Sequence, residues 1–221
     1  MKLIVAITVL FFSHSVFSQT GISAGGSIIN GFGTQKRLPA LNLGVEIPRD
    51  NESSLYIRTT FSSRSTTTES VTFQAIDPLT SPVVKYGICD FKTGYFNLEG
   101  GTRYYFGEGY DSGFALYGGT MLMLNTTGVV RRDAEGVDES KYEFVSTLGE
   151  SYDKKGRILS FNIGLNVGVK KHVGVGMFYF DITGAYSIFA LTSNSLAADY
   201  GEDLFSPLMF AFNFGFRRDL Y

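Results

Sequence analysis

The feature that most constrains this chain is a strict alternation of apolar and other side chains. Over residues 159–170 every second residue is Leu, Phe, Ile or Val, and the residues between them are Ser, Asn, Gly or Lys. Successive side chains of a strand point to opposite faces, whereas a helix would spread both kinds around its circumference. The pattern therefore predicts a β-strand with one apolar face and one polar face.

Seven further stretches show the same alternation, at 22–28, 41–47, 55–62, 96–106, 114–124, 178–188 and 208–217. Most of them are long enough to cross a bilayer as tilted strands, which takes about 9 to 11 residues. Strands of ordinary soluble proteins are shorter, at about five or six residues. The sequence therefore predicts an all-β fold with eight long strands.

The connections between these strands alternate in length. Those at 48–53, 107–111 and 171–174 are short, those at 65–91, 125–156 and 190–207 are long, and the first, at 33–38, is modest. In outer-membrane barrels the short turns are periplasmic and the long loops extracellular, and an even strand number puts both termini on the short-turn side. The alternation favours a closed antiparallel up-and-down eight-stranded transmembrane β-barrel, with both termini in the periplasm.

The polar face carries seven ionisable side chains: Glu46, Arg58, Glu99, Arg103, Lys170, Asp181 and Arg217. In an apolar core they would be costly to bury, but they suit the interior of a barrel whose apolar face meets lipid. An eight-stranded barrel is narrow enough to be filled by its own side chains. We therefore expect these groups to pair as a structural network in the lumen; the alternative is an ion or proton path.

The N-terminus has the pattern of a secretory signal peptide. Lys2 precedes an apolar run at 3–12, and Val16-Phe17-Ser18 offers a small residue for cleavage. The run is too short to cross a bilayer as a helix, although a membrane anchor is the alternative. We expect residues 1–18 to be removed, leaving a single barrel domain over 19–221.

Charge and motifs exclude several classes of function. Without Lys2 the chain has 18 basic and 21 acidic side chains, a net charge of −3, which argues against nucleic acid as a partner. Cys89 is the only cysteine, so neither a disulfide nor a cysteine-based metal centre can form within one chain. There is no phosphate loop, nucleophile elbow or zinc signature. We therefore expect no catalytic residues, no cofactor and no metal.

Two acidic clusters lie in the long connections. They consist of Asp133, Glu135, Asp138 and Glu139, and of Asp199, Glu202 and Asp203. Carboxylates in such groups could hold a divalent cation, but neither cluster has the spacing of a known calcium loop. Mixed-charge, hydrated loops are the favoured interpretation.

The last strand, Phe212-Asn213-Phe214-Gly215-Phe216, resembles the C-terminal signal by which barrel-assembly machinery recognises its clients. Together with the eight alternating strands, it resembles the small outer-membrane barrels of the OmpX and OmpA-transmembrane type over residues 20–221. The Phe-Ser-Gln cleavage region and the glycine-aromatic composition are similar to those of Bacteroidota outer-membrane proteins. The resemblance implies a bacterial outer-membrane location.

The functional hypothesis is a non-catalytic outer-membrane protein, either structural or binding, or an accessory subunit of an outer-membrane complex. Its expected partners are outer-membrane lipids, lipopolysaccharide and other outer-membrane proteins. The connection at 65–91 contains β-prone residues that could extend the flanking strands as a hairpin, either offering an edge to a partner strand or shielding the barrel mouth.

Two alternative functions are a small channel and an enzyme acting on lipid A. Similar-sized barrels that modify lipid A use a histidine with a serine at the outer rim. After cleavage His172 is the remaining histidine, and it lies in the shortest turn, at the predicted periplasmic end. That position argues against chemistry on an outer-leaflet lipid.

Overall fold

The computed structural model describes residues 20–31, 37–145, 151–201 and 207–220. The predicted signal peptide and its cleavage site after Ser18 lie outside these ranges. Among the described residues, no helix combines the length and hydropathy needed to cross a bilayer.

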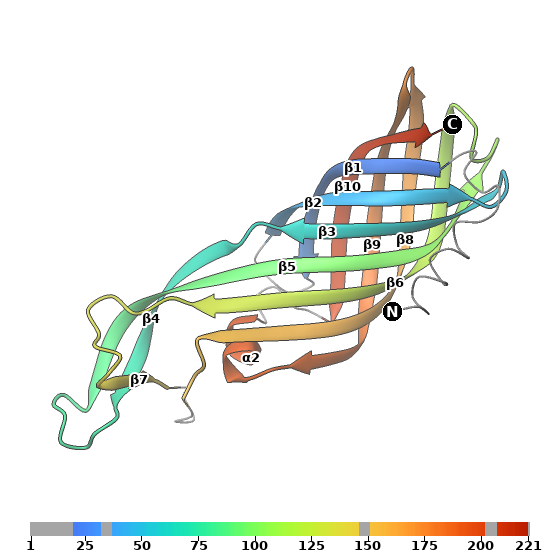
Figure 1. Cartoon of the computed structure of the whole chain (residues 1–221). Helices are drawn as coiled ribbons and strands as arrows, with labels where there is room; N and C mark the ends of the chain where they lie inside the picture. The colour runs from blue at the N-terminus through green and yellow to red at the C-terminus, as the bar shows by residue number, and fades with distance from the viewer. Residues whose placement is uncertain (1–19, 32–36, 146–150, 202–206, 221) are drawn as a thin grey trace, which may run out of the picture.

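Eight antiparallel strands close into a barrel (Figure 1). They are β1 (Thr20–Gly31), β2 (Arg37–Pro48), β3 (Ser53–Ser62), β5 (Val84–Phe106), β6 (Phe114–Arg131), β8 (Lys155–Val173), β9 (Gly176–Thr192) and β10 (Leu208–Leu220). The pairing of β1 with β10 completes the ring, and Thr20 lies opposite Leu220. The predicted all-β, eight-stranded up-and-down barrel is confirmed.

The register fixes the tilt of the strands. From Gly21 on β1 the ladder passes through β2, β3, β5, β6, β8, β9 and β10 and returns to β1 at Gly31, so the shear is 31 − 21 = 10 residues. A closed eight-stranded barrel with this stagger has strands tilted by about 40° from its axis. The interior is then just wide enough to be filled by side chains.

The two faces of the wall divide as the alternation predicts. Aliphatic and aromatic side chains cover the exterior, among them Leu43, Ile57, Leu98, Leu122, Ile163, Leu165, Phe180, Ile182 and Phe214. The intervening positions point inward and are mainly polar, charged or tyrosine. A soluble barrel would have the opposite arrangement, so this one is built to be surrounded by lipid.

Inward-facing glycines let the narrow barrel close. A Cβ on Gly119 would collide with the carbonyl oxygen of Thr102 on β5, and a Cβ on Gly25 would collide with that of Phe214 on β10. No alternative rotamer relieves a clash between a Cβ and a neighbouring backbone. These positions therefore require glycine for steric reasons.

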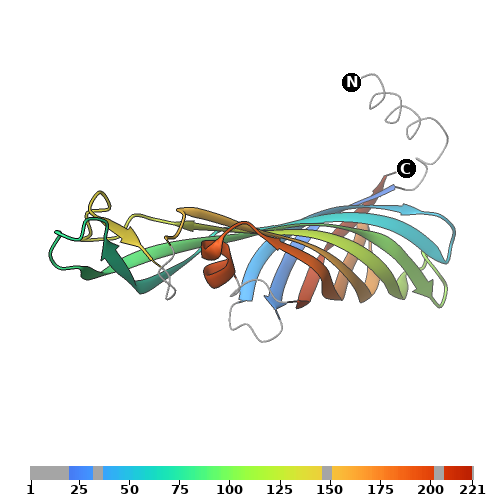
Figure 2. The ribbon, with the colours of Figure 1, turned by 90° about the horizontal axis from the view of Figure 1, so that it is seen from below.

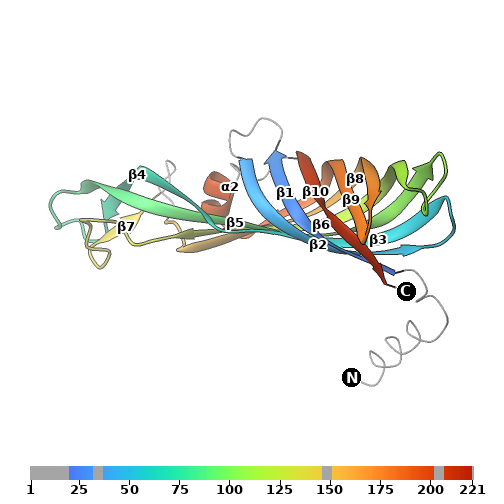
Figure 3. The same ribbon diagram turned by 90° about the horizontal axis from the view of Figure 1, so that it is seen from above.

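The two ends of the barrel differ. The short turns β2–β3, β5–β6 and β8–β9 lie at the end where β1 starts and β10 finishes, and a sheet extension projects from the opposite end (Figures 2 and 3). The extension contains β4 (Ser65–Ala75), which continues the line of β3 and pairs with the first part of β5. The predicted hairpin within 65–91 is therefore confirmed.

The other two long connections contain more regular structure than their sequence predicts. β6 continues to Arg131 and β8 already begins at Lys155, with a short strand, β7 (Tyr142–Phe144), between them. In the connection after β9, residues Ser195–Gly201 form the helix α2. Both segments were expected to be irregular, and the physical reason for their order is the packing described below.

Candidate functional site

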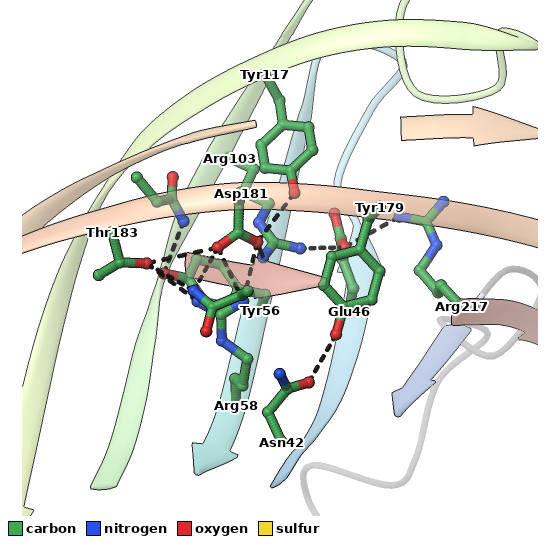
Figure 4. Close-up of polar contacts among 12 residues, drawn as sticks. Asn42, Glu46, Tyr56, Arg58, Arg103, Tyr117, Tyr179, Asp181, Thr183 and Arg217 are labelled. Atoms are coloured by element: carbon green, nitrogen blue, oxygen red, sulfur yellow. Dashed lines mark hydrogen bonds and ion pairs between the residues drawn. The ribbon is translucent and has the colours of Figure 1, made fainter. Parts of the chain in front are cut away.

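All seven ionisable residues predicted for the lumen are buried, at 7% exposure or less. They point into the bore from β2, β3, β5, β8, β9 and β10, and several of them converge on one another (Figure 4). Six of the seven are joined by direct ion pairs: Glu46, Arg58, Glu99, Arg103, Asp181 and Arg217.

Asp181 is the central anion of the network. Arg58 Nη1 donates to its two carboxylate oxygens at 2.9 and 3.1 Å, and Arg103 Nη2 lies 3.2 Å from Oδ2. The Tyr117 hydroxyl donates to Oδ2 at 3.0 Å, and Asn213 Nδ2 donates to Oδ1 at 2.7 Å. A carboxylate with this many donors is fully compensated although no part of the residue is exposed.

Two further carboxylates extend the network along the bore. Glu99 lies 2.6 Å from Arg58 Nη2. Glu46 Oε2 receives Arg103 Nη1 at 2.7 Å and Arg217 Nη1 at 3.0 Å, while Ser54 donates to Oε1 at 2.5 Å. Each arginine is therefore paired with a carboxylate, as buried guanidinium groups require.

Lys170 is placed differently from the other six. Among the described residues no carboxylate lies within ion-pair distance of it, and its ammonium group donates to the carbonyl oxygen of Tyr110. The same nitrogen lies 4.2 Å from the ring centroids of Tyr105 and Tyr110. Cation–π contact with aromatic faces thus takes the place of a counter-ion.

Tyrosine and amide side chains that were not predicted as site residues complete the network. Tyr179 donates to Asn42 at 2.7 Å, and Asn166 donates to Tyr56 at 2.8 Å. All four occupy inward positions, so the period-two pattern could have identified them. Only their mutual partners needed the three-dimensional register.

The bore is filled rather than open. Within the described part of the bore, small cavities lie beside Glu46 and Lys170 and beside Glu99 and Asn97, and each has room for about one water molecule. Paired charged side chains therefore occupy this part of the bore.

The second notable region is the sheet extension, which we call the platform. It comprises β4, the part of β5 over 84–93, the end of β6, β7, the start of β8, and α2. It encloses its own hydrophobic core, formed by Val71, Phe73, Cys89, Phe91, Val129, Ala134, Tyr142, Phe144 and Leu196. The ring of Phe91 stacks on that of Tyr200 with 3.9 Å between the ring centroids, and the ring of Phe144 stacks on that of Tyr152 with 4.4 Å between the centroids.

An ion-pair cluster closes one side of this core. Glu139 receives Arg131 Nη1 at 2.6 Å and lies 3.0 Å from the ammonium group of Lys154. Although partial burial opposes it, hydrogen bonds from Arg131, Lys154 and the Ala134 amide lower the pKa of Glu139 to about 2. The cluster fastens the connection after β6 to the start of β8.

The cation alternative for the acidic clusters gains no support. Asp133 and Glu139 are both engaged by Lys154, and no group of three or more potential metal ligands occurs within the described ranges. Glu202 and Asp203 lie outside those ranges.

The outward face of the platform bears exposed apolar side chains. Val84, Tyr86 and Ile88 point outward from alternate positions of β5 and are 47%, 74% and 53% exposed. Ile76, Leu79 and Val83 are exposed beside them at the tip. The second edge of β4 pairs with β7 only at 73–75, so over 65–72 it is open as far as the described residues extend.

His172 lies at the short-turn end of the barrel. Its side chain is exposed, and its amide donates to the carbonyl oxygen of Gly113 at 2.7 Å. The platform is at the opposite end, so His172 is remote from it.

Comparison with known proteins gives a likeness of fold. No protein-family model and no curated protein matches the sequence. Neisserial surface protein A matches with a TM-score of 0.48 at 12% identity, over 90% of this chain and 95% of that one. A major outer-membrane protein of Thermus thermophilus matches with a TM-score of 0.49 at 11% sequence identity, over 91% of this chain and 98% of that one. The outer-membrane protein OprG of Pseudomonas aeruginosa matches with a TM-score of 0.43 at 13% sequence identity, over 92% of this chain and 96% of that one.

Proposed function

We propose that this barrel is a non-catalytic binding protein of a bacterial outer membrane, which engages a partner protein through its platform. The mature chain would be residues 19–221, with the short turns and both termini in the periplasm and the platform outside the cell. Outer-membrane lipids and lipopolysaccharide would surround the wall, and other outer-membrane proteins are the expected partners.

The observation that supports binding is the apolar strip on the platform. Ile88 lies eight residues beyond Phe96, the outward apolar residue of β5 nearest the platform within the barrel wall, or about 26 Å along the strand and about 20 Å along the barrel axis. The headgroup layer on each side of a bilayer is thinner, at roughly 5 to 8 Å. Tyr86 and Ile88 therefore project into water, where a cluster of apolar side chains indicates an interaction site.

Order in the platform adds to this argument. A hydrophobic core, stacked rings and the Glu139 cluster hold its strands in one arrangement, so the strip is presented on a rigid surface. Less ordering entropy is then lost when a partner binds. A loop that only shielded the barrel mouth would not need a core of its own.

The alternative functions are not favoured. A channel needs a continuous polar path, and the described part of the bore is filled by paired side chains. A rim enzyme on lipid A needs a histidine near the outer leaflet, and His172 lies at the other end.

Cross-linking followed by co-purification from native membranes in mild detergent tests the proposal. We expect wild-type protein to retain a partner and Ile88→Glu to lose it, because the new charge would be desolvated in the interface. Thr66→Glu is the matched control, since it adds the same charge to the same face further down the platform. Protection of Cys89 from a thiol reagent reports that each variant keeps the platform core. An isolated monomer in every sample, or a partner that survives Ile88→Glu, would contradict the proposal.

A further inference from the structure

A groove of about 560 Å³ lies on the outer wall of the barrel, just below the platform. We call it the headgroup cleft. Its lining includes three cationic side chains, Arg64, Lys155 and Arg157, and three glycines, of which Gly94 and Gly128 are paired with each other. No residue of the lining is acidic.

The floor of the cleft is made by the two glycines. Gly94 on β5 is paired with Gly128 on β6, and Gly128 is paired with Arg157 on β8. A Cβ on Gly128 would meet no atom within 4 Å, and one on Gly94 would meet only Cγ of Arg64, at 3.3 Å. The missing side chains leave a hollow between two arginines whose Cα atoms stand about 14 Å apart, three strand spacings.

The cations of the cleft are available to a ligand. Among the residues that the structure describes, Arg64, Lys155 and Arg157 form no ion pair. The main chain of Arg157 is held by two hydrogen bonds: Arg157 N donates to Ser193 Oγ at 2.9 Å, and Ser193 N donates to the Arg157 carbonyl oxygen at 2.9 Å. The site is therefore a fixed cationic hollow without an internal counter-ion.

The position of the cleft indicates the source of the anion. Phe96 and Thr126 form its lower edge, with Phe61 paired beside Phe96, and below them the outward face continues with the apolar Leu98 and Leu124. The cleft thus lies where the hydrocarbon region ends and lipid headgroups begin. Arginine side chains bind phosphate oxygens with paired hydrogen bonds, and basic residues at this level attract anionic headgroups.

We propose that the headgroup cleft binds the phosphate-bearing sugar head of an outer-leaflet glycolipid of the lipid A type, with its acyl chains running down the wall over Phe96 and Phe61. Arg64 and Arg157 hold the phosphate from two sides, Lys155 adds charge, and the glycine floor admits the sugar. The proposal uses the orientation proposed above, but it is independent of any protein bound to the platform.

Native mass spectrometry of the detergent-purified mature chain with phosphorylated lipid A tests the site. We expect Arg64→Gln/Arg157→Gln to raise the Kd at least about tenfold, which corresponds to about 1.4 kcal/mol. The matched control is Lys171→Gln/Arg218→Gln, which removes the same charge from exposed positions at the short-turn end and should leave the Kd unchanged. Gly128→Leu should also weaken binding, because the new side chain fills the floor, and its Cβ would meet no atom within 4 Å.

Three results would overturn the proposal: equal affinity for lipid A whose phosphates have been removed, equal weakening in both double variants, or competition by inorganic phosphate with the same affinity as lipid A. The last result would mean that the cleft is a free-anion site. Co-purification of a platform partner with Arg64→Gln/Arg157→Gln separates the two proposals, since loss of lipid binding should leave the partner bound.

Discussion

Removing the central anion of the lumen should cost much of the barrel's stability. Asp181→Asn keeps the shape of the side chain and one acceptor oxygen but takes away its charge. Arg58 and Arg103 each lose one of two carboxylate partners, and no part of Asp181 is exposed to water that could compensate. Of the six ionisable lumen residues that remain from the predicted seven, four are basic and two are acidic.

The magnitude follows from the pairs that remain. Breaking a buried ion pair from one side costs about 3 to 5 kcal/mol. Arg58 keeps Glu99 at 2.6 Å and Arg103 keeps Glu46 at 2.7 Å, so we expect the lower end, about 3 kcal/mol. With a denaturant slope of about 3 kcal/mol per molar urea, the unfolding midpoint should fall by about 1 M.

Urea unfolding in detergent micelles, followed by the mobility difference between folded and heated protein on gels, measures this midpoint. Glu108→Gln is the matched control, because it makes the same charge change at an exposed turn residue and should shift stability by less than about 0.5 kcal/mol. If Asp181→Asn unfolds at the same urea concentration as Glu108→Gln, the lumen network does not stabilise the barrel and the reasoning is wrong.

Two other predictions concern the wall and the platform. Gly119→Ala should prevent formation of the heat-modifiable folded protein, because the new Cβ would collide with the Thr102 carbonyl oxygen. Gly113→Ala is the control and should fold, because a Cβ there meets no atom within 4 Å. A folded Gly119→Ala protein would refute the steric argument. The folded-state pKa of Glu139, about 2, lies below its ordinary 4.5, so its contribution to stability is complete above pH 4.5 and is lost as the pH falls toward 2. Limited proteolysis should therefore show the platform becoming easier to cleave as the pH falls from 4.5 toward 2. The Glu139→Gln variant should not show this pH-dependent increase in cleavage. The same increase in Glu139→Gln would show that other groups cause it.

The sequence was sufficient for the barrel because a two-sided strand is a local property. The alternation at 159–170 identifies a strand and its lipid-facing side without knowledge of any neighbour, and the inward position of Asp181 follows from the same count. The even strand number and the alternating connection lengths then predict a closed barrel with both termini at the short-turn end.

The platform could not be derived in the same way. Its core joins Phe73, Val129, Phe144 and Leu196, which come from three different connections. The sequence predicted the hairpin at 65–91, but no pattern in the three segments indicates that they pack against one another. Helix α2 is short, and tertiary packing of Leu196 and Ala197 rather than local propensity accounts for it. The headgroup cleft likewise depends on the register that sets Gly94 beside Gly128.

The central claim, that lipid touches the apolar side of the wall while the polar side faces the bore, can be tested on two adjacent residues. The chain contains no tryptophan, so one introduced indole is the only tryptophan signal. Phe180 points outward and Tyr179 inward from neighbouring positions of β9. In bilayers of brominated lipid, we expect the fluorescence of Phe180→Trp to be strongly quenched and that of Tyr179→Trp to be nearly unaffected. Strong quenching of Tyr179→Trp with an unquenched Phe180→Trp would contradict the account.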